Sequence, residues 1–326
     1  MKTLVTGSAG HLGEGVMRTL RDEGRPAVGL DIEPSDYTDV VGSISDVDNV
    51  AEAMKGVTAV IHAATLHKPH VATHSWRDFI DVNVTGTSTL LEAARGNGVS
   101  AFVFTSTTSA FGDALAPGPG EPAAWITEDV PSQPKNIYGA TKIAAEHLCK
   151  LAHRKHKTPI VILRTSRFFP EDDDNAEVRS AFDQENAKVN ELLNRRVDIE
   201  DAVSAHLLAI ERAGDIGFGS FIISATAPFE RADAALLRTN APAVVRRYAD
   251  FDDIYEARGW RMFDSLDRVY DNTRARQALG WRPRYDFSSA LAALKRGDSP
   301  FSPLAAAVGS KGYHDRVFED GPFPVE

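Results

Sequence analysis

The feature that most constrains the fold is a set of three glycines near the start of the chain, Gly7, Gly10 and Gly13. A short strand-like run precedes them, and a helical pattern over residues 14–23 follows. Glycines at this spacing permit a tight turn, a close approach of the backbone to a pyrophosphate and close packing of helix on strand. The phosphates then meet the free N–H groups at the start of the helix. The run predicts a dinucleotide-binding loop, with contacts from Gly7, Ala9, Gly10, His11, Leu12 and Gly13.

A second strand, expected over residues 27–30, ends at Asp31. A carboxylate at the tip of that strand accepts hydrogen bonds from both hydroxyls of an adenosine ribose, and it repels a 2′-phosphate. Asp31 therefore favours NAD over NADP as the cofactor. The alternative is an ordinary strand–turn–helix unit that holds no dinucleotide.

The first half of the chain alternates β-rich runs with helical patterns. Strands are expected over residues 4–6, 27–30, 59–62, 101–105 and 160–163, and helices over 14–23, 47–54, 76–97 and 138–153. This alternation predicts an α/β protein with a doubly wound parallel sheet, a Rossmann fold. We expect a dinucleotide-binding domain over residues 1–165 and a smaller, mainly substrate-binding domain over 166–326. Elements near 201–224 return to the sheet, and the tail over 297–326 has no clear pattern.

Composition limits the classes of partner. The 326 residues carry a formal net charge of −10 and no basic stripe, which argues against nucleic acid and acidic membrane surfaces as partners. No apolar run approaches the length that crosses a membrane, and the first strand begins at residue 2, so we expect no signal peptide. Cys149 is the only cysteine and has no partner for a disulfide. We therefore expect a cytoplasmic protein.

Tyr138 and Lys142 stand four residues apart on an expected helix, so their side chains share one face. A nearby ammonium lowers the pKa of a phenol, which suits Tyr138 to act as a general acid or base. Upstream, hydroxyl residues over 105–109 follow an expected strand, at the sheet edge where ligands bind. From this run we choose Thr107 as the residue that hydrogen-bonds the reacting oxygen. The alternatives are a solvated helix pair and an exposed turn.

Together these residues resemble the extended short-chain dehydrogenase/reductases, in the NAD-dependent sugar epimerase/dehydratase branch. Residues 6–13 are similar to the family's TGxxGxxG loop, and Tyr138 with Lys142 is similar to its YxxxK pair. Further similar motifs follow in order within residues 1–295: Asp46-Val47, His62-Ala-Ala64, Asn83-Val-Thr-Gly-Thr87, Thr127-Glu-Asp129 and Leu279-Gly-Trp-Arg-Pro283.

The resemblance implies an NAD-dependent enzyme that acts on a sugar carbinol. Tyr138 takes the carbinol proton, Lys142 holds the nicotinamide ribose and lowers the pKa of Tyr138, and Thr107 positions the substrate oxygen. The resemblance also implies a homodimer formed through the helices at 84–97 and 138–153. It adds cofactor contacts from Asp46, Val47, Ala63, Ala64 and Asn83.

Departures from the family pattern reduce the number of reactions that the chain is expected to catalyse. Dehydratases of this branch carry Asp-Glu after the catalytic Thr, where this chain has Thr108 and Ser109. Members that epimerise beside a carbonyl use a Cys in this run, which here has none. Two reactions remain: a nucleotide-sugar 4-epimerase, which we favour, and a dehydrogenase of a free sugar acid or polyol. A non-catalytic NAD-sensing regulator is the alternative outside the enzymes.

The sequence leaves the identity of the substrate open. The run Arg261-Met-Phe-Asp264 resembles an element that contacts the nucleotide diphosphate in sugar-nucleotide epimerases. Pro170, however, stands where these enzymes have an Asn, and Pro170-Glu171 resembles the uronate dehydrogenases instead. The residues that we name as substrate contacts are His67, Thr108, Arg167, Asn186, Arg196 and Arg261.

Two loops lie near the expected site. The insertion over residues 113–125 is either a lid in which Trp125 covers a sugar ring or a plain surface loop. His67, His70 and His74 recur in the other loop, but no acidic or Cys ligand accompanies them, so we expect no metal site.

Overall fold

The computed structural model describes residues 1–173, 175–312 and 318. Its centre is a seven-stranded sheet in the order β3-β2-β1-β4-β5-β7-β8, in which every pairing is parallel. The doubly wound sheet predicted from the alternating pattern is confirmed. The strands are β1 Thr3–Thr6, β2 Ala27–Asp31, β3 Val40–Val41, β4 Ala59–His62, β5 Ala101–Thr107, β7 Ile160–Thr165 and β8 Phe218–Ile223.

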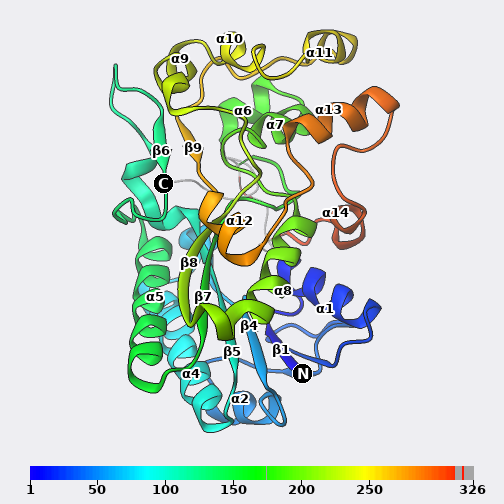
Figure 1. Cartoon of the computed structure of the whole chain (residues 1–326). Coiled ribbons are helices and arrows are strands. Elements are labelled where there is room, and N and C mark those ends of the chain that lie inside the picture. The colour runs from blue at the N-terminus through cyan, green and yellow to red at the C-terminus, as the bar shows by residue number, and fades with distance from the viewer. Residues whose placement is uncertain (174, 313–317, 319–326) are drawn as a thin grey trace.

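Helices cover both faces of the sheet (Figure 1). Val5 and Ile61 point into the core beneath α1 and α8, whereas Leu4 and Val60 point into the core beneath α4 and α5. Both faces are therefore buried, which is why the strands consist of nearly continuous apolar runs. The first face carries α1 His11–Asp22, α8 Ile199–Ile216, α12 Thr273–Leu279 and α14 Pro303–Val308; the second carries α2 Val47–Ala53, α4 Gly86–Gly96 and α5 Ile137–His156.

The order of the strands reverses at β1. The chain adds β2 and β3 on one side of β1 and then returns to place β4 on the other side. A reversal of this kind opens a crevice at the carboxyl ends of the strands. Gly7 follows β1 and Ala63 follows β4, so both residues lie at this crevice.

The helix expected over residues 76–97 is interrupted. α3 (Trp76–Phe79) continues into a π-helical segment, Ile80–Thr85, before α4 begins. Asn83 lies in this widened segment and is buried. Such segments occur often at functional sites, and the 3.6-residue periodicity of the sequence does not reveal them.

A second unit with its own core lies at the top of Figure 1. Phe251, Tyr255 and Phe287 are buried in that core. Its β6–β9 pair was not predicted, because two strands of three residues are too short to show periodicity. Its elements are α6 Ala176–Ala181, α7 Gln184–Glu191, α9 Ala234–Thr239, α10 Ala241–Val245, α11 Asp252–Arg258, α13 Phe287–Arg296 and a parallel pair of strands, β6 Ala124–Ile126 and β9 Arg268–Tyr270.

The remaining described elements are short. Helices of the 3₁₀ type occupy Lys68–Ala72, Thr108–Leu115 and Arg231–Asp233. Within the tail, α14 packs Leu304 against the core beneath α1, while residues 313–317 and 319–326 lie outside the described part of the chain. None of the described helices combines the length and the apolar character needed to cross a membrane.

Candidate functional site

A cavity of about 1240 Å³ runs along the carboxyl ends of the central strands. Residues that follow five different strands line it, among them Gly7, Asp31, Ala63, Thr107 and Arg167. We call this cavity the pocket.

The glycine loop at one side of the pocket depends on the absence of side chains. Gly7 has a φ of +74°, and a Cβ there would lie 2.7 Å from the backbone N of Ala64. A Cβ at Gly13 would lie 1.8 Å from the carbonyl O of Gly7, so only glycine allows α1 to approach the loop this closely. Gly10 is the N-cap of α1 and lines the pocket. The first turn of α1 thus offers free N–H groups and the positive end of a helix dipole to an anion.

Asp31 places a carboxylate beside this loop. Its Oδ2 accepts a hydrogen bond from the backbone N of Ala9 at 2.9 Å, and its Oδ1 accepts one from the backbone N of Glu33 at 3.0 Å. Asp31 and Glu33 both line the pocket. The carboxylate therefore holds the loop in place and makes this end of the pocket negative.

Only some of the other expected cofactor contacts line the pocket. Ala63 and Ala64 line the pocket, but Asp46 and Val47 are not among its described lining residues; residues 42–44 line it instead. Asp46 is the N-cap of α2 and accepts two backbone N–H groups of that helix, at 2.9 and 3.0 Å. Val47 is 67% exposed. An acidic residue before a helix is favoured by capping alone, which explains the motif in this structure.

Asn83 acts on the pocket through its neighbours. Its Oδ1 accepts hydrogen bonds from the backbone N of Leu66 at 2.8 Å and from Oγ1 of Thr65 at 2.9 Å. Its Nδ2 donates to Oγ1 of Thr141 at 3.0 Å. Thr65 and Leu66 line the pocket, whereas Asn83 is not among the described lining residues. Asn83 therefore fixes the loop after β4 against α5.

Thr107, Tyr138 and Lys142 line one part of the pocket together. Thr107 ends β5, and its Oγ1 accepts the backbone N–H of Ser109 at 3.1 Å. Tyr138, in the first turn of α5, shares a side-chain hydrogen bond with Thr107. Lys142 follows one turn later, with Nζ 4.2 Å from the centroid of the Phe104 ring. All three expected catalytic residues are buried at the same site.

Burial shifts the pKa values of Tyr138 and Lys142 in opposite directions. It raises the pKa of Tyr138 to about 12, against a smaller lowering effect of the hydrogen bond with Thr107. It lowers the pKa of Lys142 to about 7. Both shifts favour the uncharged form, as removal from water does. The expectation that Lys142 would lower the pKa of Tyr138 is therefore not met in this structure, because desolvation dominates.

A buried ion pair between Glu146 and Arg164 lies next to Lys142. Glu146, one turn after Lys142 on α5, accepts hydrogen bonds from Nη2 of Arg164 at 2.7 Å and from Oγ of Ser106 at 2.6 Å. Its negative charge partly offsets the effect of burial on the pKa of Lys142. Arg164 and Ser106 come from different strands, so no local pattern predicts this arrangement.

Three of the six residues named as substrate contacts line the pocket: His67, Thr108 and Arg167. The His67 ring packs against the Phe169 ring, with 5.5 Å between the centroids. Thr108 shares a side-chain hydrogen bond with Tyr270, which also lines the pocket.

The other three, Asn186, Arg196 and Arg261, are not among the described lining residues. Oδ1 of Asn186 accepts the backbone N–H of Arg261 at 3.2 Å, and the guanidinium of Arg261 lies 4.5 Å from the centroid of the Phe182 ring. Nη1 of Arg196 donates to the backbone O of Phe169 at 2.9 Å. In this structure these side chains take part in packing and internal hydrogen bonds.

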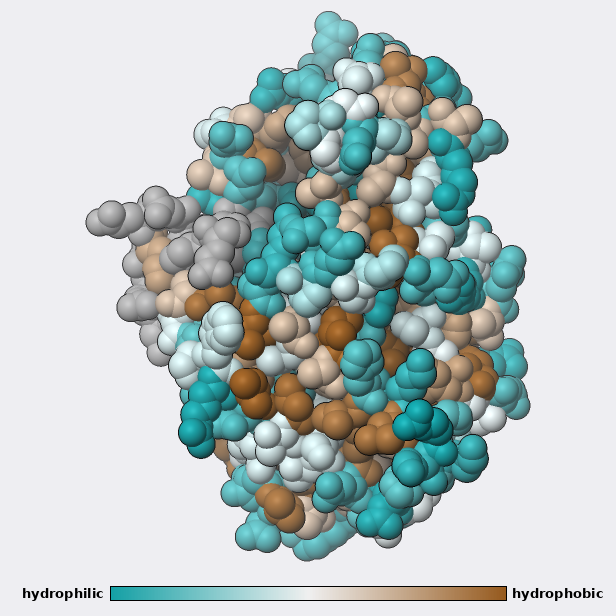
Figure 2. Space-filling view, turned by 90° about the vertical axis from the view of Figure 1, so that its left-hand side faces the viewer, coloured by the Kyte–Doolittle hydropathy of each residue, from teal (hydrophilic) through white to brown (hydrophobic). Residues whose placement is uncertain are grey.

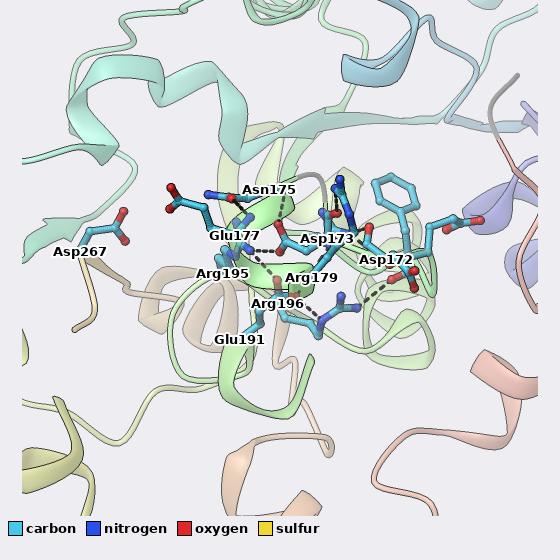
Figure 3. Close-up of polar contacts among 12 residues, drawn as sticks. Asp172, Asp173, Asn175, Glu177, Arg179, Glu191, Arg195, Arg196 and Asp267 are labelled. Atoms are coloured by element: carbon cyan, nitrogen blue, oxygen red, sulfur yellow. Dashed lines mark hydrogen bonds and ion pairs between the residues drawn. The ribbon is translucent and has the colours of Figure 1, made fainter. Parts of the chain in front are cut away.

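Arg196 belongs to a buried network of charges next to the pocket (Figure 3). Glu191 accepts hydrogen bonds from Nη2 of Arg195 and from Nε of Arg196, both at 2.7 Å, and Arg195 also pairs with Asp173. Although burial alone would raise it, the guanidinium charges hold the pKa of Glu191 well below its usual range. Burial raises the pKa of Asp173 to about 6. The network fixes the guanidinium of Arg195, which lines the pocket.

β9 supplies two lining residues that the sequence analysis did not name, Arg268 and Tyr270. Side chains two residues apart on a strand share a face. Val269, between them, faces the core of the second unit. The alternation is present in the sequence, but three residues do not distinguish a strand from a loop.

Glu171 joins the tail to the glycine loop. Its Oε1 lies 2.8 Å from Nε2 of His11 and accepts hydrogen bonds from Oγ of Ser310 at 2.8 Å and from the backbone N of Lys311 at 3.0 Å. Although burial alone would raise it, these partners lower the pKa of Glu171 to about 2. Lys311 also pairs with Glu14 of α1 and lines the pocket.

Trp125 does not lie over the pocket. Its Nε1 donates to Oδ2 of Asp271 at 3.3 Å, and the Arg231 guanidinium lies 5.3 Å from its ring centroid. Of the insertion over residues 113–125, the described lining includes Leu115 and Ala116.

The histidines of the other loop contact one another. The ring centroids of His67 and His70 lie 4.7 Å apart, and those of His70 and His74 lie 5.2 Å apart. The described part of the chain contains no group of three or more His, Cys, Asp or Glu residues that could hold a metal ion.

Comparison with known protein families gives the relationship of the chain. A model of the NAD dependent epimerase/dehydratase family matches residues 3–219. The chain belongs to this family. The resemblance inferred from the motifs is confirmed, and with it the expectations of an enzyme of this type and of NAD as its cofactor. The roles of individual residues stay predictions.

Curated relatives include several UDP-glucose 4-epimerases. The chain is 32% identical to that of Corynebacterium glutamicum over 163 residues, and 33% identical to that of Streptomyces lividans over 159 residues. These matches span under half of the relatives' length, 45% and 46%. A UDP-glucose 4-epimerase of Lactobacillus helveticus is 25% identical over 321 residues, which cover 88% of this chain and 93% of that protein.

Solved structures with the same fold cover nearly the whole chain. A short-chain dehydrogenase/reductase superfamily protein from Agrobacterium tumefaciens with bound NAD is 25% identical, with a TM-score of 0.65 over 94% of this chain and 99% of that one. The UDP-glucose 4-epimerase of Thermus thermophilus in complex with NAD is 22% identical, with a TM-score of 0.61 over 90% and 99% of the two chains. The second likeness concerns the fold alone.

Proposed function

We propose that this chain is a nucleotide-sugar 4-epimerase that oxidises a sugar carbinol with NAD and then reduces the product again. The observation that carries the proposal is the meeting of Thr107, Tyr138 and Lys142 in one pocket with the glycine loop and Asp31. The names of the curated relatives support the substrate class.

The residues at the cofactor end fit a dinucleotide. At Gly7 and Gly13 a Cβ would collide with backbone, so only glycine lets α1 approach the loop this closely, and the N–H groups of the first turn of α1 are placed to face a pyrophosphate. The carboxylate of Asp31, at the end of the neighbouring strand on the same edge, suits the adenosine ribose hydroxyls.

Each catalytic side chain has one role in the proposed reaction. NAD, when bound, accepts the hydride from the carbinol carbon. Tyr138 accepts the hydroxyl proton of the same carbinol, and Thr107 hydrogen-bonds the oxygen as it becomes a carbonyl. We assign to Lys142, in its protonated form, the role of favouring the phenolate of Tyr138 and so of opposing the rise in pKa that burial causes in this structure. In the return step Tyr138 gives the proton back, and the sugar accepts hydride on its other face.

A second candidate is a dehydrogenase of a free sugar acid. It is favoured by the position of Arg261, which is absent from the described lining of the pocket although its run resembles the element that contacts the diphosphate in sugar-nucleotide epimerases. A smaller substrate needs no diphosphate contacts of that kind.

Product analysis distinguishes the two candidates. Protein and NAD are incubated with UDP-glucose and, separately, with D-glucuronate, and the products are separated by chromatography. The epimerase predicts UDP-galactose without net reduction of NAD. A stoichiometric loss of D-glucuronate with accumulation of reduced nicotinamide makes the chain a dehydrogenase instead. An NAD-sensing regulator predicts neither product.

The homodimer also stays a proposal. Figure 2 shows hydrophobic side chains gathered in a band across the lower half of the face on which α5 lies. Leu151 of α5 is 42% exposed, which is unusual for a leucine of a solvated helix. A monomeric mass by light scattering at micromolar concentration would contradict a dimer through α4 and α5. A cytoplasmic location is supported by the single cysteine, Cys149, which is buried and unpaired.

A further inference from the structure

Charge is divided between the two ends of the pocket. Among the described lining residues the carboxylates are Asp31 and Glu33, both at the end of β2. Arg167, Arg195 and Arg268 line the pocket as well, and we call the part lined by Arg195 and Arg268 the cationic end; Lys311 also lines the pocket, but it pairs with Glu14 beside the glycine loop. The whole chain carries a formal net charge of −10, so a cationic end is not a reflection of its overall composition. A concave site with one sign of charge concentrates ligands of the opposite sign.

β9 places Arg268 in the same pocket as Thr107 and Tyr138. Arg268 and Tyr270 share the face of β9 that lines the pocket. Tyr270 is 4% exposed and shares a side-chain hydrogen bond with Thr108, the neighbour of Thr107. Arg195 and Arg268 line the same pocket as Tyr270, and their charges oppose the rise in the pKa of Tyr270 that burial causes. The cationic end thus adjoins the position of the carbinol.

Arg268 is buried without strong partners. Its side chain is 15% exposed, and its Nε lies 3.6 Å from Oδ1 of Asp267, which is longer than a hydrogen bond. Its Nη1 reaches the backbone O of Leu115 only at 3.5 Å. Within the described residues Nε has no hydrogen-bond partner. Buried donors are normally satisfied, and an unsatisfied one is costly. Nε itself is closed to solvent, so the donors that remain for a ligand are those of the two Nη atoms, of which Nη1 makes only the long contact with Leu115.

Arg195 differs from Arg268 in being held in place. The carboxylates of Glu191 and Asp173 bind its Nη2, as the dashed lines in Figure 3 mark. The same view shows Asp267 set apart from this network. Arg195 therefore contributes a fixed positive charge, while Arg268 contributes a fork of donors whose geometry matches a carboxylate or a phosphate.

We propose that Arg268, with Arg195 and Tyr270 beside it, forms a subsite that binds an anionic group of the substrate, either a carboxylate of a sugar acid or a phosphate of a nucleotide sugar. The inference rests on the proposed oxidation of a sugar carbinol in this pocket and adds the residue that selects the substrate. Arg268 is then a specificity-determining residue, and its removal changes which sugars bind rather than whether NAD binds.

The test measures binding to the NAD-loaded protein by titration calorimetry with two matched pairs of probes. D-Glucuronate is compared with neutral D-glucuronamide, and UDP with uridine. We expect the wild type to bind at least one anion about 10-fold more tightly than its neutral partner, which corresponds to ~1.4 kcal/mol for a charged hydrogen bond. Arg268→Gln should remove that preference, and Arg268→Lys should keep part of it. The control is Arg246→Gln, because Arg246 is exposed and pairs with Asp252 outside the pocket.

The probe pair that loses its preference identifies the anionic group. A wild type that prefers neither anion, or a preference that survives in Arg268→Gln, overturns the subsite. If Arg268→Gln loses NAD affinity through misfolding, Arg268→Lys decides: an undiminished preference there contradicts bidentate recognition. Turnover is measured separately. If Arg268→Gln loses the preference for the anion but the wild type turns over no sugar, the proposed function is rejected and the subsite is kept. If the wild type turns over a sugar but Arg268→Gln keeps the preference, the subsite is rejected and the proposed function is kept.

Discussion

The two ends of the pocket are built in different ways. The cofactor end comes mainly from residues at or directly after the ends of β1, β2 and β4, such as Gly7, Asp31 and Ala63. The substrate end draws on the connection before α8 and on β9, which supply Arg195 and Arg268. The lining carboxylates, Asp31 and Glu33, belong to the first end together with Lys311, and the guanidiniums of Arg195 and Arg268 belong to the second.

The difference teaches where local sequence determines a site and where it does not. A glycine at a position with no room for a Cβ, or an acid at the end of a strand, is constrained by its neighbours in the sequence. A short sequence motif therefore predicts the cofactor-binding role of such residues. Arg268 reaches the pocket only because β9 pairs with β6. Its role depends on the assembled second unit. Substitutions at the two ends should therefore have separable effects on the binding of cofactor and of substrate.

The largest effect is expected at the boundary between the two ends. Tyr138→Phe removes the proton acceptor and should lower kcat by about 10²–10⁴-fold, the usual contribution of general acid–base catalysis. NAD affinity should stay unchanged, because the ring still fills its site. Steady-state kinetics and fluorescence titration with NAD measure the two quantities. Retention of full activity in Tyr138→Phe would remove this residue from the mechanism, whereas a wild type that binds NAD but turns over no sugar would favour the regulator.

Lys142 should control the pH dependence of stability. Its pKa is lowered from a usual 10.5 to about 7 in the fold, so between these values the unfolded chain binds more protons. The free energy of unfolding of the cofactor-free protein should therefore rise from about pH 7 toward pH 10. Lys142→Met avoids the buried charge and should be more stable than the wild type at pH 6, by roughly 2–4 kcal/mol.

Urea unfolding of both proteins at several pH values checks this expectation. The difference between wild type and Lys142→Met isolates Lys142 from other titrating groups. Parallel stability curves for the two proteins from pH 6 to 9 would mean that Lys142 is not desolvated as the structure indicates.

A smaller effect is expected at the cofactor end. Asp31→Ala removes an acceptor for the ribose hydroxyls and a charge that repels a 2′-phosphate, so the preference for NAD over NADP should fall by about 10-fold, the value of one charged hydrogen bond. Asp31→Asn is the matched control, because it keeps an acceptor for the backbone N of Ala9 and removes only the charge. The affinities of the two cofactors are measured for each variant. Unchanged selectivity in both variants would place cofactor discrimination elsewhere.

The smallest effect is expected at Asp46, where it distinguishes capping of α2 from the predicted contact with the cofactor. Asp46 was predicted to contact the cofactor, yet it caps α2 in the structure. Asp46→Ala should lower the free energy of unfolding by about 1 kcal/mol without changing NAD affinity, and Asp46→Asn should restore the cap. A drop in NAD affinity with unchanged stability would favour the role given by the family resemblance.

Much of the Rossmann half was predictable from the sequence. Its strands are buried on both faces and stand out as apolar runs, and the glycines mark the first turn between them. The π-helical segment around Asn83 was not predictable, because its shape follows from side-chain bonds to Leu66 and Thr141. The substrate end was predicted in part. His67, Thr108 and Arg167 follow strands closely and line the pocket, as expected of strand ends.

Three predicted substrate contacts lie outside the described lining of the pocket for a shared physical reason. Asn186, Arg196 and Arg261 were chosen for their residue types and for motif likeness. The structure gives them internal partners, and those partners lie far away in the chain: Oδ1 of Asn186 binds the backbone N of Arg261. Likewise, the spacing of Tyr138 and Lys142 predicts a shared face but not how deeply it is buried. Burial raises the pKa of Tyr138, against the expected direction, and it lowers the pKa of Lys142, for which no direction was predicted.

The most direct test of the account is a rapid-mixing experiment on the NAD-loaded protein. UDP-glucose and D-glucuronate are each mixed with wild type and with Tyr138→Phe, and absorbance is followed in the reduced-nicotinamide band. The account predicts a rise in the wild type with at least one sugar, transient for an epimerase and lasting for a dehydrogenase, and no rise in Tyr138→Phe. An equal rise in both proteins, or no rise with either sugar from a protein that binds NAD and the sugar, would contradict carbinol oxidation at Thr107, Tyr138 and Lys142.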